Sequence, residues 1–97
     1  MASVKGLKKD IDLVMSLVLN DCFYVLEYNE KVNRDAVMDL AGEVIKQHRE
    51  FRVRTNHPDG KNDPKKVKEN YSKLMDEVMK TADEDLEKLS AEVKKTA

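Results

Sequence analysis

The chain has 97 residues, of which 40% are hydrophobic and 38% charged, and its formal net charge is −1. This length suits a single domain covering residues 1–97, and the charge gives no overall attraction to nucleic acid or to an anionic membrane. The lone cysteine, Cys22, excludes a disulfide framework, and no apolar run approaches the ~20 residues that span a bilayer. We therefore expect a cytoplasmic protein without a membrane partner.

The first predicted helix covers about residues 3–28. Apolar residues recur there at three- and four-residue steps on one face, and a second apolar stripe lies roughly 130° to 160° away. This second stripe consists of Leu13, Leu17, Tyr24 and Tyr28. A helix that is apolar on two sides is normally buried by several neighbours, which would make it the central helix of a bundle. The alternative is that the stripe forms the seam of a homodimer.

The second predicted helix covers residues 34–54, with Asn33 as its N-cap. Gly42 is its weak point and would permit close approach of another helix. We interpret His48 as a neutral core or boundary histidine with one ring nitrogen hydrogen-bonded, so acid should weaken the fold by forcing it to become charged. The apolar face of this helix comprises Val37, Leu40, Ala41, Val44, Ile45, His48 and Phe51.

The third predicted helix covers residues 64–95, because Asp63 is a good N-cap and Pro64 suits the first helical position. At ~1.5 Å per residue it would reach ~45 Å, against ~30 Å for the second helix, so its last turns should overhang the bundle, fray or pack on another copy. Short linkers then predict an all-α, antiparallel three-helix bundle. The buried stripe of this helix comprises Val67, Tyr71, Leu74, Met75, Val78, Ala82, Leu86, Leu89 and Val93.

The connection between the second and third helices lies in a basic region, since residues 46–68 carry a local charge of +5. Turn chemistry explains Pro58, Asp59 and Gly60, but it does not explain His57 or the lysines at the start of the third helix, where the helix dipole disfavours cations. We therefore predict that the basic end around residues 52–66 contacts a protein partner. The candidate binding residues are Arg49, Arg52, Arg54, His57, Asp59, Lys61, Lys65 and Lys66.

Over about 45 residues the chain resembles the J-domain family, co-chaperones that stimulate DnaK-type chaperones. The resemblance is carried by His57-Pro58-Asp59, by the arginines that precede it, and by Tyr71 and Leu74 at aromatic and aliphatic core positions of the following helix. The segment Phe23-Tyr24-Val25-Leu26 is similar to the opening segment of that family. The resemblance implies that His57, Pro58 and Asp59 contact a chaperone.

Arg52 and His57 also match the Arg-x(4)-His spacing of HEPN-type RNases, which are dimeric helical bundles. That resemblance implies that the arginine stabilises phosphate charge and that the histidine transfers a proton near neutral pH. The alternative function is thus RNA cleavage or phosphate binding with Arg52 and His57.

The layout as a whole resembles small bacterial helical proteins that carry a similar Asn-His-Pro-Asp-Gly-Lys loop and have no assigned activity. No Gly-rich phosphate loop, catalytic carboxylate pair or metal-ligand spacing is present in the sequence. We therefore expect an interaction module rather than an enzyme, with no catalytic residue, metal or cofactor.

Overall fold

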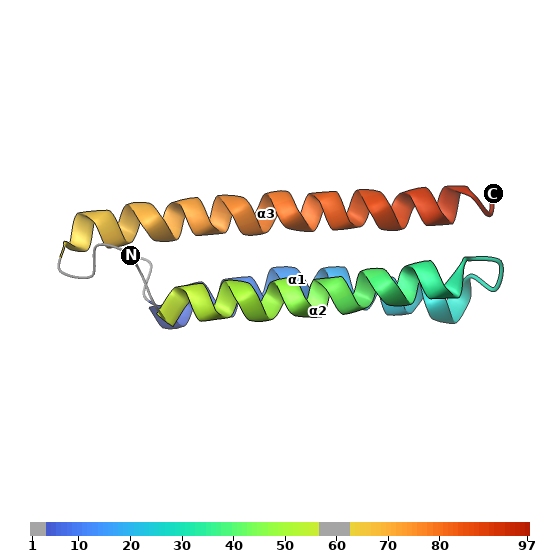
Figure 1. The fold of residues 1–97 in the computed structure, drawn as a ribbon, viewed down its shortest axis with the longest axis horizontal. Helices are drawn as coiled ribbons and strands as arrows, with labels where there is room; N and C mark the ends of the chain where they lie inside the picture. Colours follow the sequence, from blue (N-terminus) through green and yellow to red (C-terminus); the bar gives the residue numbers. More distant parts are fainter. Residues whose placement is uncertain (1–3, 57–62) are drawn as a thin grey trace.

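The computed structural model describes residues 4–56 and 63–97, and these residues form three α-helices and no strand. The helices are α1 (Val4–Tyr28), α2 (Arg34–Asn56) and α3 (Pro64–Lys94). They lie side by side, with α1 and α3 running in one direction and α2 in the other (Figure 1). The predicted all-α, antiparallel three-helix bundle is confirmed.

The two predicted N-caps are both present. The side chain of Asn33 accepts a hydrogen bond from the backbone N–H of Ala36 at 3.1 Å. At the start of α3, the Asp63 side chain accepts from the N–H groups of Lys65 and Lys66 at 3.1 and 3.4 Å. Each cap satisfies backbone donors that have no partner inside the helix, so local sequence explains where both helices begin.

The end of α2 is tied to α3. The helix runs two residues past the predicted end at Arg54, through Asn56. The buried Thr55 hydroxyl donates to the carbonyl of Arg52 at 2.6 Å, and the Tyr71 hydroxyl donates to the carbonyl of Thr55 at 3.4 Å. The last carbonyls of a helix lack intrahelical partners, so Tyr71 satisfies one of them from the neighbouring helix.

Each helix buries one apolar stripe, as its periodicity predicts. The predicted stripes are wrong at two positions, Ile45 and Leu86, which are exposed. Asp85, which was not predicted to be buried, is buried. Leu86 lies about 100° further round α3 than Asp85, which turns it towards the edge of the helix packing. The core comprises Leu7, Ile11, Met15, Val18, Cys22, Leu26, Val32, Val37, Leu40, Ala41, Val44, Phe51, Tyr71, Leu74, Val78, Ala82 and Leu89.

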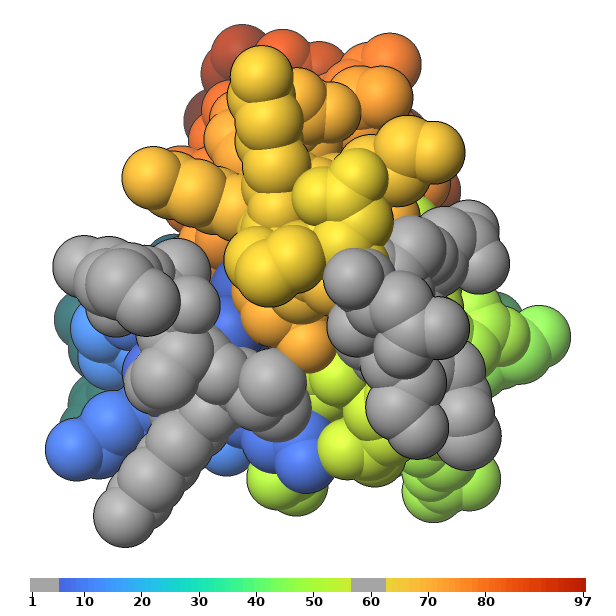
Figure 2. Space-filling model, turned by 90° about the vertical axis from the view of Figure 1, so that its left-hand side faces the viewer, coloured from blue at the N-terminus to red at the C-terminus, as the bar shows by residue number. Residues whose placement is uncertain are grey.

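No helix occupies a central position. Seen from the end where α3 begins, the helices lie at the corners of a triangle (Figure 2), and each packs against both others. The second stripe of α1 is consequently uncovered: Leu13 is 60%, Leu17 56%, Tyr24 64% and Tyr28 66% exposed. The interpretation of α1 as a central helix covered by its neighbours is therefore wrong.

The extra length of α3 lies at the opposite end from the one predicted. The first turns of α3 project beyond α1 and α2, whereas its C-terminal end is level with the α1–α2 connection (Figure 1). There Asn29 Nδ2 donates to Thr96 Oγ1 at 3.0 Å, and Leu89 is buried. The predicted overhang of the last turns is thus wrong, because these turns pack against the bundle.

Gly42 lies on the exposed side of α2, and a Cβ atom added there would meet no atom within 4 Å. The expectation that this glycine permits close approach of another helix is therefore wrong. In an open helical position glycine only lowers helix stability, by about 0.5–1 kcal/mol relative to alanine.

Candidate functional site

The structure does not gather the predicted basic residues into one patch. Arg52 and Arg54 lie about 160° apart around α2, so their side chains face different neighbours. Arg52 pairs with a residue of α1 and Arg54 with a residue of α3. Lys65 and Lys66 are exposed on the first turn of α3. The candidates His57, Asp59 and Lys61 lie outside the described residues.

Arg49 and Arg52 do line a common shallow groove, of about 460 Å³, between the first turns of α1 and the last turns of α2. Three basic side chains and a histidine meet there with two exposed apolar side chains. The complete lining consists of Lys8, Ile45, His48, Arg49, Arg52, Val53 and Asn56. We call this feature the basic groove.

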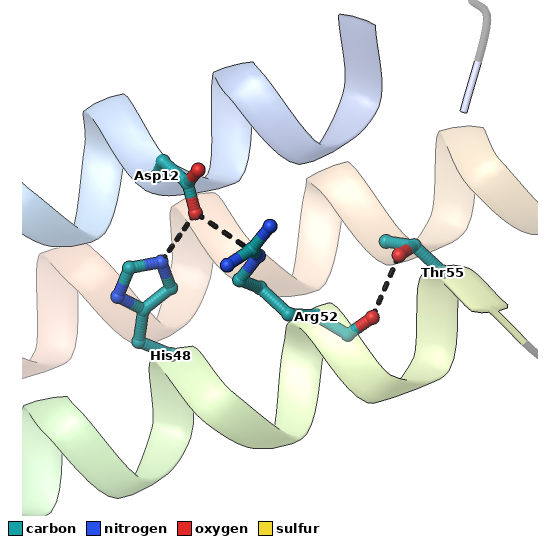
Figure 3. Close-up of polar contacts among 4 residues, drawn as sticks. All are labelled: Asp12, His48, Arg52 and Thr55. Carbon is teal, nitrogen blue, oxygen red and sulfur yellow. Dashed lines mark hydrogen bonds and ion pairs between the residues drawn. The ribbon is translucent and has the colours of Figure 1, made fainter. Parts of the chain in front are cut away.

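One carboxylate of α1 organises the wall of the basic groove (Figure 3). Asp12 Oδ1 lies 2.6 Å from His48 Nε2 and 3.4 Å from Arg52 Nε. His48 and Arg52 are four residues apart on α2, so both side chains lie on the side that faces Asp12. One carboxylate therefore contacts both the imidazole and the guanidinium, and it partly offsets the charge of Arg52.

His48 therefore differs from its sequence-based interpretation. The predicted hydrogen bond to one ring nitrogen is present, but the partner is a carboxylate and the side chain is 28% exposed. The predicted loss of stability in acid depended on a ring buried in the core, and His48 is only half-buried.

Arg54 belongs to the opposite side of α2. Its guanidinium lies 2.7 Å from Glu77 of α3, and its central carbon lies 6.0 Å from the centre of the Phe51 ring. Both contacts are at the bundle surface, where such interactions each contribute at most about 1 kcal/mol. Arg54 thus helps to join α2 to α3 and takes no part in the basic groove.

The lining of the basic groove combines positive charge with exposed apolar side chains. Its lining includes no hydroxyl or thiol that His48 could activate as a nucleophile. Within residues 4–56 and 63–97, neither Lys8 nor Arg49 has an ion-pair partner. Together with exposed Ile45 and Val53, these two cations form a surface that is both positive and apolar.

Sequence reasoning did not find Lys8 and Asp12 as members of this site. They are four residues apart on α1, which places them on one side of that helix. Their spacing is visible in the sequence. That this side faces α2 next to His48 depends on how the helices pack, and helical periodicity does not specify which neighbour a flank meets.

A second polar cluster lies inside the bundle, away from the basic groove. Asp85 of α3 is 1% exposed, and its Oδ1 accepts a long hydrogen bond, 3.4 Å, from Gln47 Nε2. Its other oxygen, and the side-chain oxygen of Gln47, are buried without a hydrogen-bond partner in the part of the chain described. Burial raises the pKa of Asp85 above its usual value, and the carboxylates of Glu43 and Glu84 add to this effect, while Gln47 and Lys88 oppose it.

Cys22 lies in the core near this cluster and is reduced. Burial, followed by the carboxylates of Asp85 and Asp21, raises the pKa of its thiol. A buried thiol that stays protonated is a poor nucleophile and a poor metal ligand. Among the described residues, moreover, no group of three or more His, Cys, Asp or Glu side chains is placed to hold a metal ion.

Comparisons with family models, with curated proteins and with solved structures found no match to this chain. The helices of the described ranges include none that is both long and apolar enough to cross a membrane.

Proposed function

We propose that this protein is a small cytoplasmic interaction module whose basic groove binds an acidic, partly apolar segment of another protein. The observation that carries the proposal is the composition of the groove. Lys8 and Arg49, which have no ion-pair partner among the described residues, share its lining with the exposed side chains of Ile45 and Val53. Positive charge attracts an acidic segment and orients it, and apolar contact adds affinity that salt does not screen.

The same composition disfavours a nucleic acid as the main partner. Backbone binding to nucleic acid depends on many cations acting together, and base stacking requires exposed aromatic side chains. The groove lining has no aromatic side chain other than the His48 ring, and that ring is held by Asp12. A protein segment uses both the charged and the apolar parts of this surface.

The proposal is tested with a short synthetic peptide that alternates glutamate with leucine, and with a control peptide in which glutamine replaces glutamate. Arg49→Glu should weaken binding of the acidic peptide about tenfold, because it replaces an attraction with a repulsion. Asp12→Asn should strengthen binding several-fold, because it releases His48 and Arg52 from their carboxylate.

Calorimetric titration at low and moderate salt measures both variants. Lys46→Glu, on the outer side of α2 and outside the groove lining, is the matched control for a general effect of charge. Equal affinity of Arg49→Glu and Lys46→Glu for the acidic peptide would refute the basic groove as the binding site. Tighter binding of single-stranded RNA than of the acidic peptide would refute the proposal that the partner is a protein segment.

Self-association is a second candidate function, supported by the exposure of all four residues of the α1 stripe, Leu13, Leu17, Tyr24 and Tyr28. The tyrosine rings lie 4.6 Å apart at an angle of 41°, so they present one joint apolar surface. Exposed apolar patches of this kind mark protein interfaces. The mass of the unmodified protein, followed over a range of concentrations, tests this candidate.

Two alternative functions involve residues of the segment between α2 and α3, and both remain hypotheses. The J-domain-like contact would use His57, Pro58 and Asp59, and an RNase or phosphate site would use Arg52 with His57. Engagement of Arg52 by Asp12 reduces the charge it can offer to a phosphate. Stimulation of a DnaK-type ATPase, or cleavage of RNA that His57→Ala abolishes, would favour one of them. The resemblance in this loop also leads us to group the chain with small bacterial helical proteins.

A further inference from the structure

The exposed stripe on α1 has a spacing that is symmetric about its own centre. Steps of four, seven and four residues separate Leu13, Leu17, Tyr24 and Tyr28. Reversing the direction of the helix leaves this pattern of positions unchanged. Two copies aligned antiparallel would therefore place Leu13 opposite Tyr28 and Leu17 opposite Tyr24, over about 22 Å of helix.

The two ends of the stripe differ in shape. Two adjoining hollows, of about 510 and 300 Å³, lie at its tyrosine end between α1 and α3, and both are lined by Tyr24, Val25 and Val93. The leucine end instead presents the two exposed side chains of Leu13 and Leu17. An antiparallel pair brings the leucines of each copy to the hollows of the other. The same contact, of projecting leucines with a hollow, then forms at both ends of the stripe.

Charge distinguishes the antiparallel from the parallel arrangement. Asp10, Leu17, Tyr24 and Lys31 follow one another at seven-residue steps, so Asp10 lies beyond the leucine end and Lys31, which lines the larger hollow together with Glu30, lies beyond the tyrosine end. Antiparallel copies place Asp10 next to Lys31 of the other copy. Parallel copies place each charge next to its own equivalent.

We propose that a second copy of the chain packs antiparallel on the α1 stripe, with Leu13 and Leu17 of each copy entering the hollows beside Tyr24 and Tyr28 of the other. This inference rests on the self-association proposed above. Such a contact is isologous and closes as a dimer. A stable interface buries roughly 800 Å² on each partner, and exposed Met79 and Leu86 of α3 widen the stripe towards that size.

Cross-linking tests the arrangement with cysteines placed at the charged ends, which leaves the apolar stripe intact. Two single variants, Asp10→Cys and Lys31→Cys, are oxidised separately and after mixing. In an antiparallel dimer each variant alone should stay uncross-linked, because its two copies of the cysteine lie far beyond the ~7 Å between Cα atoms that a disulfide bridges. The mixture should yield a mixed disulfide dimer.

Wild-type protein controls for the native Cys22, which is buried, and a mixture of Lys46→Cys with Asp10→Cys controls for random collision. Disulfide dimers of either variant alone would overturn the antiparallel arrangement while leaving self-association standing. A dimeric mass without any cross-link in the mixture would overturn the proposed register. A monomeric mass of the unmodified protein at all concentrations would overturn both proposals.

Charge exchange gives an independent check that needs no cysteine. Asp10→Lys and Lys31→Glu should each weaken dimerisation about tenfold, because an antiparallel dimer contains this pairing twice. Combining both changes in one chain should restore the wild-type dissociation constant. In a parallel dimer the single changes would only exchange one like-charge contact for another, so unchanged dissociation constants for both single variants would overturn the proposal.

Discussion

The edge between α1 and α2 and the edge between α1 and α3 lie on either side of the same helix, and they are built differently. Asp12 of α1 joins His48 and Arg52 of α2, and on the far side of α2 the pairs Arg54–Glu77 and Glu43–Lys88 join it to α3. In the described ranges every ion pair between two helices has a member in α2. Along the α1–α3 edge, the exposed side chains of Tyr24, Tyr28 and Leu86 line open hollows instead.

This difference shows which part of the surface is complete within one chain. Ion pairs at an edge keep it soluble and specify the neighbouring helix, although each contributes little stability. An apolar edge with open hollows leaves surface that a second molecule can remove from water. Ion pairs therefore join α2 to both of its neighbours, and the α1–α3 edge is where we propose that a second copy binds.

The largest effect on stability should distinguish the buried side of α1 from its exposed stripe. Ile11 is fully buried, so Ile11→Ala should destabilise the fold by about 2–5 kcal/mol through lost burial and a residual cavity. Leu17→Ala, on the exposed stripe of the same helix, should change the monomer by no more than about 0.5 kcal/mol. Urea unfolding of dilute protein measures both, and equal losses would contradict the assigned burial.

The buried cluster of Asp85 and Gln47 predicts a gain in stability from a single substitution. Asp85→Asn should stabilise the fold at pH 7 by about 1–3 kcal/mol, because it removes a buried charge and supplies an N–H donor for the unpartnered Gln47 oxygen. Thermal unfolding as a function of pH is the measurement.

The pH dependence of this effect has a definite sign. The folded-state pKa of Asp85 is raised above its usual value of 3.8, so the folded chain binds the proton more tightly than the unfolded chain. The contribution of Asp85 to stability is fully present below the unfolded pKa and is lost as the pH rises through the folded pKa. The advantage of Asp85→Asn should therefore shrink as the pH falls towards 3.8; an advantage that grows in acid would refute the assignment.

The smallest effect is expected away from both edges, on the outer face of α2. Gly42→Ala should stabilise the fold by about 0.5–1 kcal/mol, since the added methyl group meets no neighbouring atom and the unfolded chain loses freedom. Chemical denaturation measures the change, with unaltered dimerisation as the control. A loss of stability would mean that this face is covered.

The sequence predicts the helices and their buried faces because both follow from short-range rules. N-caps at Asn33 and Asp63 and the spacing of apolar residues need no knowledge of the other helices. The predictions failed at flanks such as Leu86 and the α1 stripe. Whether a flank is covered depends on the angles between helices, and three helices packed as a triangle leave each with an open side.

The basic groove, too, was only partly predictable from the sequence. Arg49 and Arg52 share a groove near the end of the molecule that the charge count indicated. The count could not separate Arg52 from Arg54, because helical rotation carries their side chains to different neighbours. Nor could it show that Asp12 of α1 partly neutralises the arginine that the RNase hypothesis requires.

The central claim is that the α1–α3 edge is completed by a second copy, and sedimentation equilibrium tests it most directly. Wild-type protein should show a concentration-dependent mass that rises to twice the 11.2 kDa of the chain. Leu17→Glu should remain monomeric with unchanged helix content, while Met38→Glu, at an equally exposed apolar position of α2, should still dimerise. Equal masses for wild type and Leu17→Glu would contradict the account.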